Sequence, residues 1–161
     1  SRGLGDVYKR QGYTDHLGRH VMIIRDLKIG KYNWSLRIYF AVTGYYTDHI
    51  IKSLIDIQCP DELVVRIRKN LKKADMDTGF TYSNKRQRKS VIVIGMHSSH
   101  AQFLNSCEHE LRHLVDDIAM ACRLQMAGEE VAYLTGDINS ELWDDIHRFT
   151  CCKCDKCNSQ N

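Results

Sequence analysis

The 161-residue sequence lacks the features that mark several classes of protein. It has no apolar run long enough to cross a membrane and no signal-peptide pattern, so we expect neither a membrane protein nor a secreted one. Its seven cysteines do not form the regular framework of a small disulfide-stabilised domain. Cys59, Cys107 and Cys122 fall at apolar positions of expected helices or turns and are interpreted as reduced core thiols. A reducing, cytoplasmic compartment is therefore predicted.

The sequence also lacks a strong charge of one sign. Its formal net charge is +3, which does not by itself demand a nucleic-acid partner. The basic loop at residues 85–89, together with basic side chains after Pro60, could contact phosphates. However, no aromatic residues alternate with these cations, and no nucleic-acid-binding motif accompanies them. A nucleic-acid-associated function is thus only an alternative, and a solvated loop is the expectation.

Periodicity places one α+β domain at residues 22–150, with no internal repeats. Four segments have the alternating or continuous apolar pattern of strands: 21–24, 34–42, 80–82 and 90–96. Five have helical spacing: one after Thr47, one beginning at Pro60, one from Ser99 to Cys122, one from Glu129, and one at 141–149.

The two ends of the chain do not share this periodicity. Residues 1–11 resemble a translated sequencing adapter, and residues 1–21 are expected to be an artefactual or disordered extension. Residues 151–161 form a polar tail with four thiols: Cys151, Cys152, Cys154 and Cys157. Two overlapping C-x-x-C spacings resemble a metal knuckle, but the chain has no second knuckle to complete a closed site. We expect an exposed tail, with metal binding or redox chemistry as alternatives.

The most informative motif is His109-Glu110-Leu111-Arg112-His113, a match to the HExxH pattern. Residues four apart share one face of a helix, so His109 and His113 can bind one metal ion. Glu110 lies beside them, in position to act as a general base on water. Ser99 and Gln102 form an S-x-x-Q capping box before the run, which supports a helix here. The alternative is a surface helix with two solvated histidines.

A catalytic zinc site needs a third protein ligand and an open position for water. Glu129 and Glu130 follow a predicted reversal of the chain, and one of them could face the histidines from the first turn of the next helix. The alternative is that both carboxylates stabilise that helix N-terminus. Four further residues are considered for supporting roles: Tyr133 or His147 as an oxyanion donor, and Asp116 or Asp117 as a partner of a ligating histidine.

The segment at residues 78–138 resembles a family of HExxH-containing zincin-like proteins, metallopeptidases of phages and mobile elements of gut bacteria. The matching pieces are TGFTYSN at 78–84, SVIVIG at 90–95, HELRHL at 109–114 and GEEVAYLTG at 128–136. The resemblance implies Glu129 as the third ligand. It also implies a minimal zincin core, in which a small twisted antiparallel or mixed sheet packs against helices and residues 90–96 form the edge strand that receives substrate. No glycine and third histidine follow HELRH, which argues against a metzincin.

These features predict a zinc-dependent peptidase that acts on a peptide or protein substrate. His109, His113 and Glu129 would bind Zn²⁺, and Glu110 would be the general base. The alternative is a non-catalytic binding or regulatory protein with the same fold, because fold does not determine function.

Overall fold

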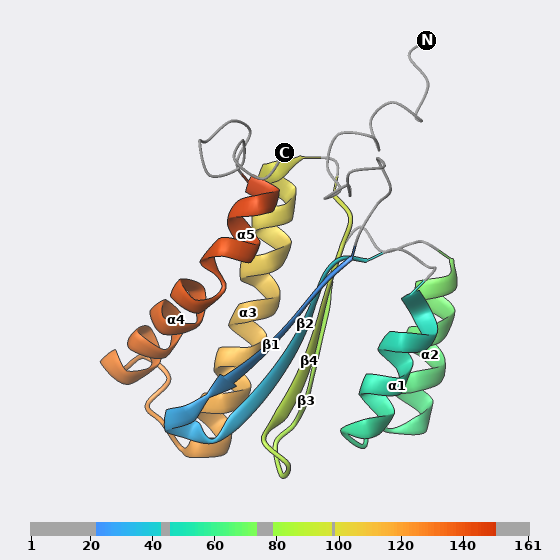
Figure 1. Ribbon diagram of the computed structural model, residues 1–161. Coiled ribbons are helices and arrows are strands. Elements are labelled where there is room, and N and C mark those ends of the chain that lie inside the picture. Colours follow the sequence, from blue (N-terminus) through green and yellow to red (C-terminus); the bar gives the residue numbers. More distant parts are fainter. Residues whose placement is uncertain (1–21, 43–45, 74–78, 98, 151–161) are drawn as a thin grey trace.

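The computed structural model describes residues 22–42, 46–73, 79–97 and 99–150. These residues form an α+β fold, as predicted, in which a four-stranded mixed sheet lies between two layers of helices (Figure 1). The strands are β1 (Ile23–Ile29), β2 (Trp34–Val42), β3 (Phe80–Asn84) and β4 (Lys89–Gly95). The helices are α1 (Thr47–Asp56), α2 (Asp61–Lys72), α3 (His100–Cys122), α4 (Glu129–Glu141) and α5 (Trp143–Thr150). The predicted extensions at 1–21 and 151–161 lie outside the described residues.

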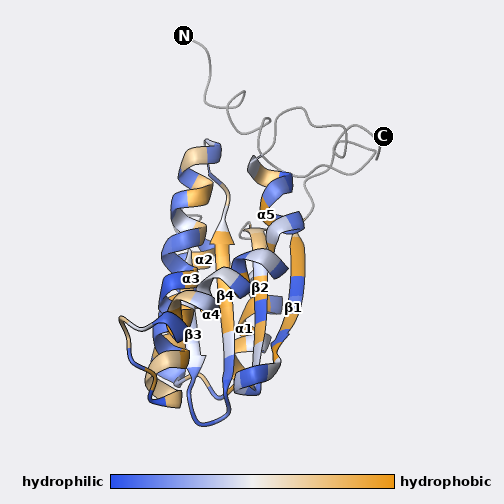
Figure 2. Cartoon of the chain, turned by 90° about the vertical axis from the view of Figure 1, so that its left-hand side faces the viewer, coloured by the Kyte–Doolittle hydropathy of each residue, from blue (hydrophilic) through white to orange (hydrophobic). Residues whose placement is uncertain are grey.

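The strands lie in the order β1-β2-β4-β3, which Figure 2 shows from the side of the α3 layer. β1 pairs with β2 and β3 pairs with β4 in antiparallel fashion, while β2 and β4 are parallel. The prediction that residues 90–96 form an edge strand is therefore wrong, because β4 is an inner strand and β3 is the edge. The exposures give the reason: six of the seven β4 residues are buried, whereas β3 is half-buried throughout.

The two faces of the sheet bury two separate hydrophobic cores. Ile38 and Phe40 of β2 face the layer formed by α3, α4 and α5, whereas Tyr39 between them faces α1 and α2. This alternation follows from the two-residue period of a strand. β4 alternates in the same way, with Ile92 on the α3 side and Val93 on the α1 side. The sheet is thus covered on both sides, and α3 is held against it by a continuous core.

Helix α3 begins where the capping pattern predicts. The Ser99 hydroxyl accepts a hydrogen bond of 3.1 Å from the backbone N–H of Gln102, and Arg123, in the left-handed conformation, caps the other end after Cys122. Its buried stripe includes Cys107, Leu111, Leu114 and Ile118. Within the described residues, no helix combines the length and apolar composition needed to cross a membrane.

Cys107 and Cys59 are buried free thiols, as predicted, and Cys122 is half-buried. Burial raises the pKa of Cys107 to about 12 and that of Cys59 to about 11, since the thiolate loses its hydration. The reactive thiolate is therefore scarce at pH 8 in the folded protein. We expect a thiol alkylating reagent to modify Cys122 before Cys59 and Cys107, as measured by peptide mass mapping over time. Modification of Cys107 at the same rate as Cys122 in folded protein would contradict this.

Candidate metal centre

The HExxH run lies in the middle of α3, and its two histidines converge in the structure. The Nε2 atoms of His109 and His113 are 3.1 Å apart, and their rings are nearly perpendicular, at 82°. Two nitrogens bound to one tetrahedral zinc ion at about 2.0–2.1 Å each would lie roughly 3.3 Å apart. The same distance also permits a hydrogen bond between two neutral rings of opposite tautomer. Both side chains are exposed, so the pair is accessible to solvent and to a metal ion.

Glu110, next to His109 in the chain, is buried against strand β3. Its residue is only 5% exposed, and its carboxylate accepts a hydrogen bond of 2.7 Å from the Thr81 hydroxyl. The same hydroxyl also lies 3.0 Å from the backbone carbonyl oxygen of Glu110. A hydroxyl has one proton, so it is shared between these two acceptors or alternates between them. Thr81 thereby fixes the Glu110 side chain against the sheet. Sequence reasoning assigned no role to Thr81, whose only signal is its place in the TGFTYSN segment.

Gly79 allows this close approach of β3 to α3. A Cβ atom at Gly79 would overlap the backbone carbonyl oxygen of Val93 and would lie 3.0 Å from Cγ of Glu110. Only a residue without a side chain fits in this space. Gly79 therefore helps to position both Thr81 and Glu110.

An ion pair at the other end of β3 also joins this strand to α3. Nζ of Lys85, in the β3–β4 turn, lies 2.9 Å from Oδ1 of Asp117. Asp116 lies 2.9 Å from Nη2 of Arg112, one helical turn before it. Asp116 and Asp117, the two alternatives for the partner of a ligating histidine, thus each contact a cation. With Thr81 and Lys85 both touching α3, β3 runs along the helix from Glu110 to Asp117, a stretch that includes His113 in sequence.

The two candidate third ligands lie elsewhere. α3 continues for nine residues beyond His113 to Cys122, about 14 Å at 1.5 Å per residue, before the chain reverses into α4. Glu129 begins α4 as an exposed residue. Among the described residues, no group of three His, Cys, Asp or Glu side chains gathers as a metal site. The structure therefore brings His109 and His113 together but does not bring Glu129 to them, and its role as a ligand stays a prediction.

Glu130 contacts the connection between β1 and β2. Its carboxylate lies 2.9 Å from Nζ of Lys31 and accepts a hydrogen bond of 3.0 Å from the Tyr32 hydroxyl, next to the β1–β2 connection. The hydrogen bond from Lys31 lowers the pKa of the Glu130 carboxyl. β1 and β3 are opposite edges of the sheet. Glu130 thus contacts the connection that follows β1, whereas Glu110 of the HExxH run contacts β3.

The candidate oxyanion donors are likewise separate from the histidine pair. Tyr133 is 68% exposed and lines a groove between α4 and β1. The His147 ring stacks on Trp143 within α5, with the ring centroids 5.0 Å apart. Neither arrangement involves His109 or His113.

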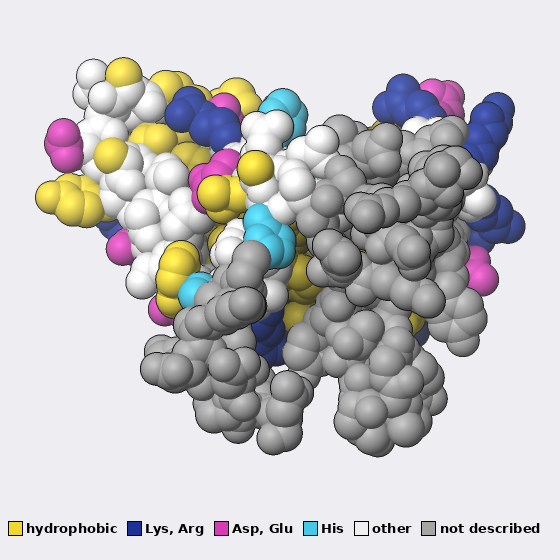
Figure 3. All heavy atoms as spheres, turned by 90° about the horizontal axis from the view of Figure 1, so that it is seen from above, with side chains coloured by type: hydrophobic (Ala, Val, Ile, Leu, Met, Phe, Trp, Pro, Cys, Tyr) yellow, Lys and Arg dark blue, Asp and Glu magenta, His cyan; other side chains and the backbone are white. Residues whose placement is uncertain are grey.

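The basic loop is partly occupied by contacts within the chain. Lys85 pairs with Asp117, and Arg88 donates a hydrogen bond of 2.9 Å to the backbone carbonyl of Tyr32. Two of its four cations thus contact other parts of the chain. Other basic side chains gather at the outer side of the α1–α2 layer (Figure 3), where Lys69 and Lys72 of α2 are exposed. The histidine pair on α3 belongs to the opposite layer.

Comparison of the chain with protein-family models, with curated proteins and with solved structures finds no match.

Proposed function

We propose that the protein is a zinc-dependent peptidase whose metal is held by His109 and His113. The convergence of their Nε2 atoms to 3.1 Å, on an exposed helix face beside the buried Glu110, is the observation that supports this most. Zinc bound there would polarise the scissile carbonyl and make water acidic enough to attack near neutral pH. Glu129 is retained as the proposed third ligand, and the assignment requires its carboxylate to approach the pair.

Glu110 has the role of general base in this proposal. Its carboxylate accepts a proton from the attacking water and delivers it to the nitrogen of the leaving amine. Thr81 holds the carboxylate in place through the 2.7 Å hydrogen bond, so the base does not have to reorient before each proton transfer. The substrate is a peptide in extended conformation.

The free edge of β3 is the proposed path of this peptide. β3 is an edge strand, so one side of its backbone has no strand partner among the described residues. An added strand can use those N–H and C=O groups for hydrogen bonds. Because β3 runs along α3, a peptide paired with it would pass beside His109 and His113. This replaces the path along residues 90–96 that the resemblance implied.

A non-catalytic binding or regulatory protein is the second candidate, and one observation favours it. Only two ligands gather among the described residues, and two histidines can hold a metal loosely or none at all. A cytoplasmic location is proposed for either function, supported by the buried free thiols of Cys59 and Cys107.

Metal analysis tests the proposed site. Purified protein is expected to contain about one zinc ion per chain, and His113→Ala should lose it because the variant lacks one of the three protein ligands that such a site needs. His100→Ala, which removes a histidine on the same helix outside the HExxH run, is the matched control and should keep the metal. Zinc that persists in His113→Ala but disappears on removal of residues 151–161 would assign the ion to the cysteines and overturn the proposal.

A further inference from the structure

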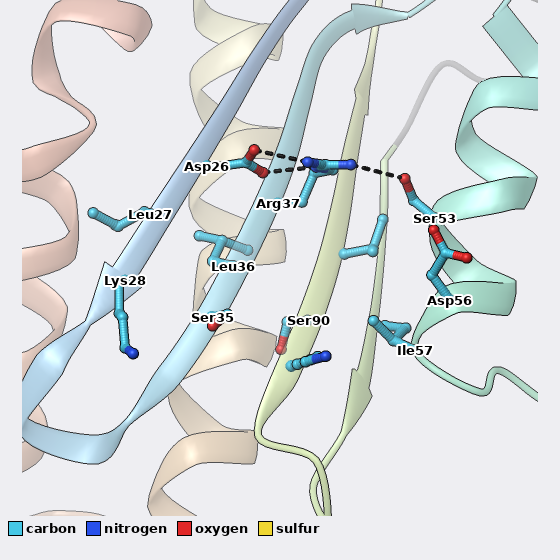
Figure 4. A pocket seen from close by; sticks show the side chains of 12 residues that line it. Asp26, Leu27, Lys28, Ser35, Leu36, Arg37, Ser53, Asp56, Ile57 and Ser90 are labelled. Carbon is cyan, nitrogen blue, oxygen red and sulfur yellow. Dashed lines mark hydrogen bonds and ion pairs between the residues drawn. The ribbon is translucent and has the colours of Figure 1, made fainter.

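A cavity of about 460 Å³ lies on the other face of the sheet, between α1 and strands β1, β2 and β4 (Figure 4). Its lining combines polar side chains of the strands with apolar ones, among them Ile57 just after α1 and Val91 of β4, which belong to one hydrophobic core. The cavity faces the α1–α2 layer and is separate from the histidine pair on α3. No role in the proposed peptidase uses it.

The strand register places two lysines on either side of a serine in this cavity. Lys28 of β1 is directly opposite Ser35 of β2, and Ser35 is opposite Lys89 of β4. All three line the cavity and are exposed. The two lysine backbones are two strand spacings apart, about 10 Å. Each lysine has a flexible four-carbon stem, so both ammonium groups can reach one anion above the Ser35 hydroxyl.

Neither lysine is neutralised by a salt bridge within the described residues. The one carboxylate on β1 is Asp26, and Arg37 donates two hydrogen bonds of 2.6 and 2.7 Å to it. This bidentate pair lowers the pKa of Asp26, because the hydrogen bonds from Arg37 stabilise its charged form. Among the described residues, Asp26 thus pairs with Arg37 and forms no salt bridge with Lys28, so the charge of Lys28 is left for a ligand.

The Asp26–Arg37 pair is connected to α1, and this connection fixes one wall of the cavity. Nη1 of Arg37 lies 3.5 Å from the Ser53 hydroxyl, which is itself 2.6 Å from the Tyr39 hydroxyl (Figure 4 shows the first of these contacts). Tyr39 and Ser53 are buried, so this network is held by the core. Asp56 at the end of α1 is the one further carboxylate in the lining. The charged side chains of the lining are thus three cations and two anions: Lys28, Arg37 and Lys89, with Asp26 and Asp56.

We propose that this cavity binds a small phosphate monoester, with its phosphate between Lys28 and Lys89. Lysines are phosphate ligands that act as point charges, and the Ser35 hydroxyl adds a hydrogen bond. The apolar part of the ester would contact Ile57 and Val91. This inference is independent of the metal centre and of the proposed peptidase activity.

Titration of the full chain with phenyl phosphate and with inorganic phosphate tests the site, with amide chemical shifts and calorimetry as the measurements. We expect saturable binding of one phenyl phosphate, tighter than that of inorganic phosphate, with shifts at Lys28, Ser35 and Lys89. Lys28→Ala combined with Lys89→Ala should weaken it by about tenfold or more, because two charge-assisted contacts are lost. Lys52→Ala combined with Lys69→Ala removes the same charge from α1 and α2 and should have little effect.

Asp26→Asn is expected to change the affinity for phenyl phosphate in the opposite direction. It releases the guanidinium of Arg37 into the cavity, so phenyl phosphate should bind more tightly than to the unaltered chain. Equal weakening by the two lysine pairs would show only general charge attraction and would overturn the proposal. Equal affinities for the two probes would overturn the assignment of an ester, and the lack of saturable binding would overturn the site.

Discussion

Replacing Glu110 by Gln is expected to leave the fold and the zinc content unchanged and to lower the rate of peptide hydrolysis by about 10²- to 10⁴-fold, the range typical of losing a general base. Glutamine has the same shape, so it fits beside Gly79, and its amide oxygen can still accept the Thr81 hydroxyl hydrogen bond. The amide cannot take a proton from water at neutral pH. Hydrolysis of a fluorescently labelled, unfolded protein, with zinc measured in the same samples, is the appropriate assay.

Glu108→Gln is the matched control for this change. Glu108 is an exposed residue two positions earlier on α3, so its replacement removes the same charge from the same helix. The control should retain both zinc and activity. If the Glu110 variant hydrolyses the substrate as fast as the Glu108 variant, Glu110 is not the base. If neither the unaltered chain nor the variants hydrolyse any peptide while zinc is bound, the non-catalytic alternative is favoured.

The elements that follow local rules were predictable from the sequence. The i, i+3, i+4 spacing of apolar residues predicts α3, and Ser99 with Gln102 marks its beginning, where the structure has the cap. The convergence of His109 and His113 follows from helix geometry alone, since they are four residues apart. The alternating pattern of residues 34–42 predicts β2 because a strand has a two-residue period.

The features that were missed depend on contacts between segments far apart in the sequence. Strand order is one, because a continuous apolar run such as Val91–Ile94 shows burial on both faces but not which strands lie beside it. The position of Glu129 is another. It depends on how far α3 continues past His113 and on which edge of the sheet α4 covers. The contact of Thr81 with Glu110 joins residues 29 apart and has no local signature.

Replacing Gly79 by Ala is expected to destabilise the protein by about 3 kcal/mol or more, the upper end of the cost of overpacking a core. The added methyl group would overlap the carbonyl oxygen of Val93, which belongs to the paired backbone of β4 and cannot move away by changing a rotamer. The chain would have to withdraw from β4 at the start of β3. That shift would also move Thr81 away from Glu110, so activity should fall even in molecules that remain folded.

Gly136→Ala makes the same chemical change where the structure has room for it. Gly136 is exposed within α4, and a Cβ atom there meets nothing within 4 Å. Alanine is the better helix former, so this variant should be more stable than the unaltered chain by roughly 0.5–1 kcal/mol. Urea unfolding followed by circular dichroism measures both changes. A lower free energy of unfolding for Gly79→Ala and a higher one for Gly136→Ala would support the close contact of β3 with β4 and α3. A Gly79 variant as stable as the unaltered chain would show that β3 does not approach Glu110 closely, and Thr81 could not then hold the carboxylate.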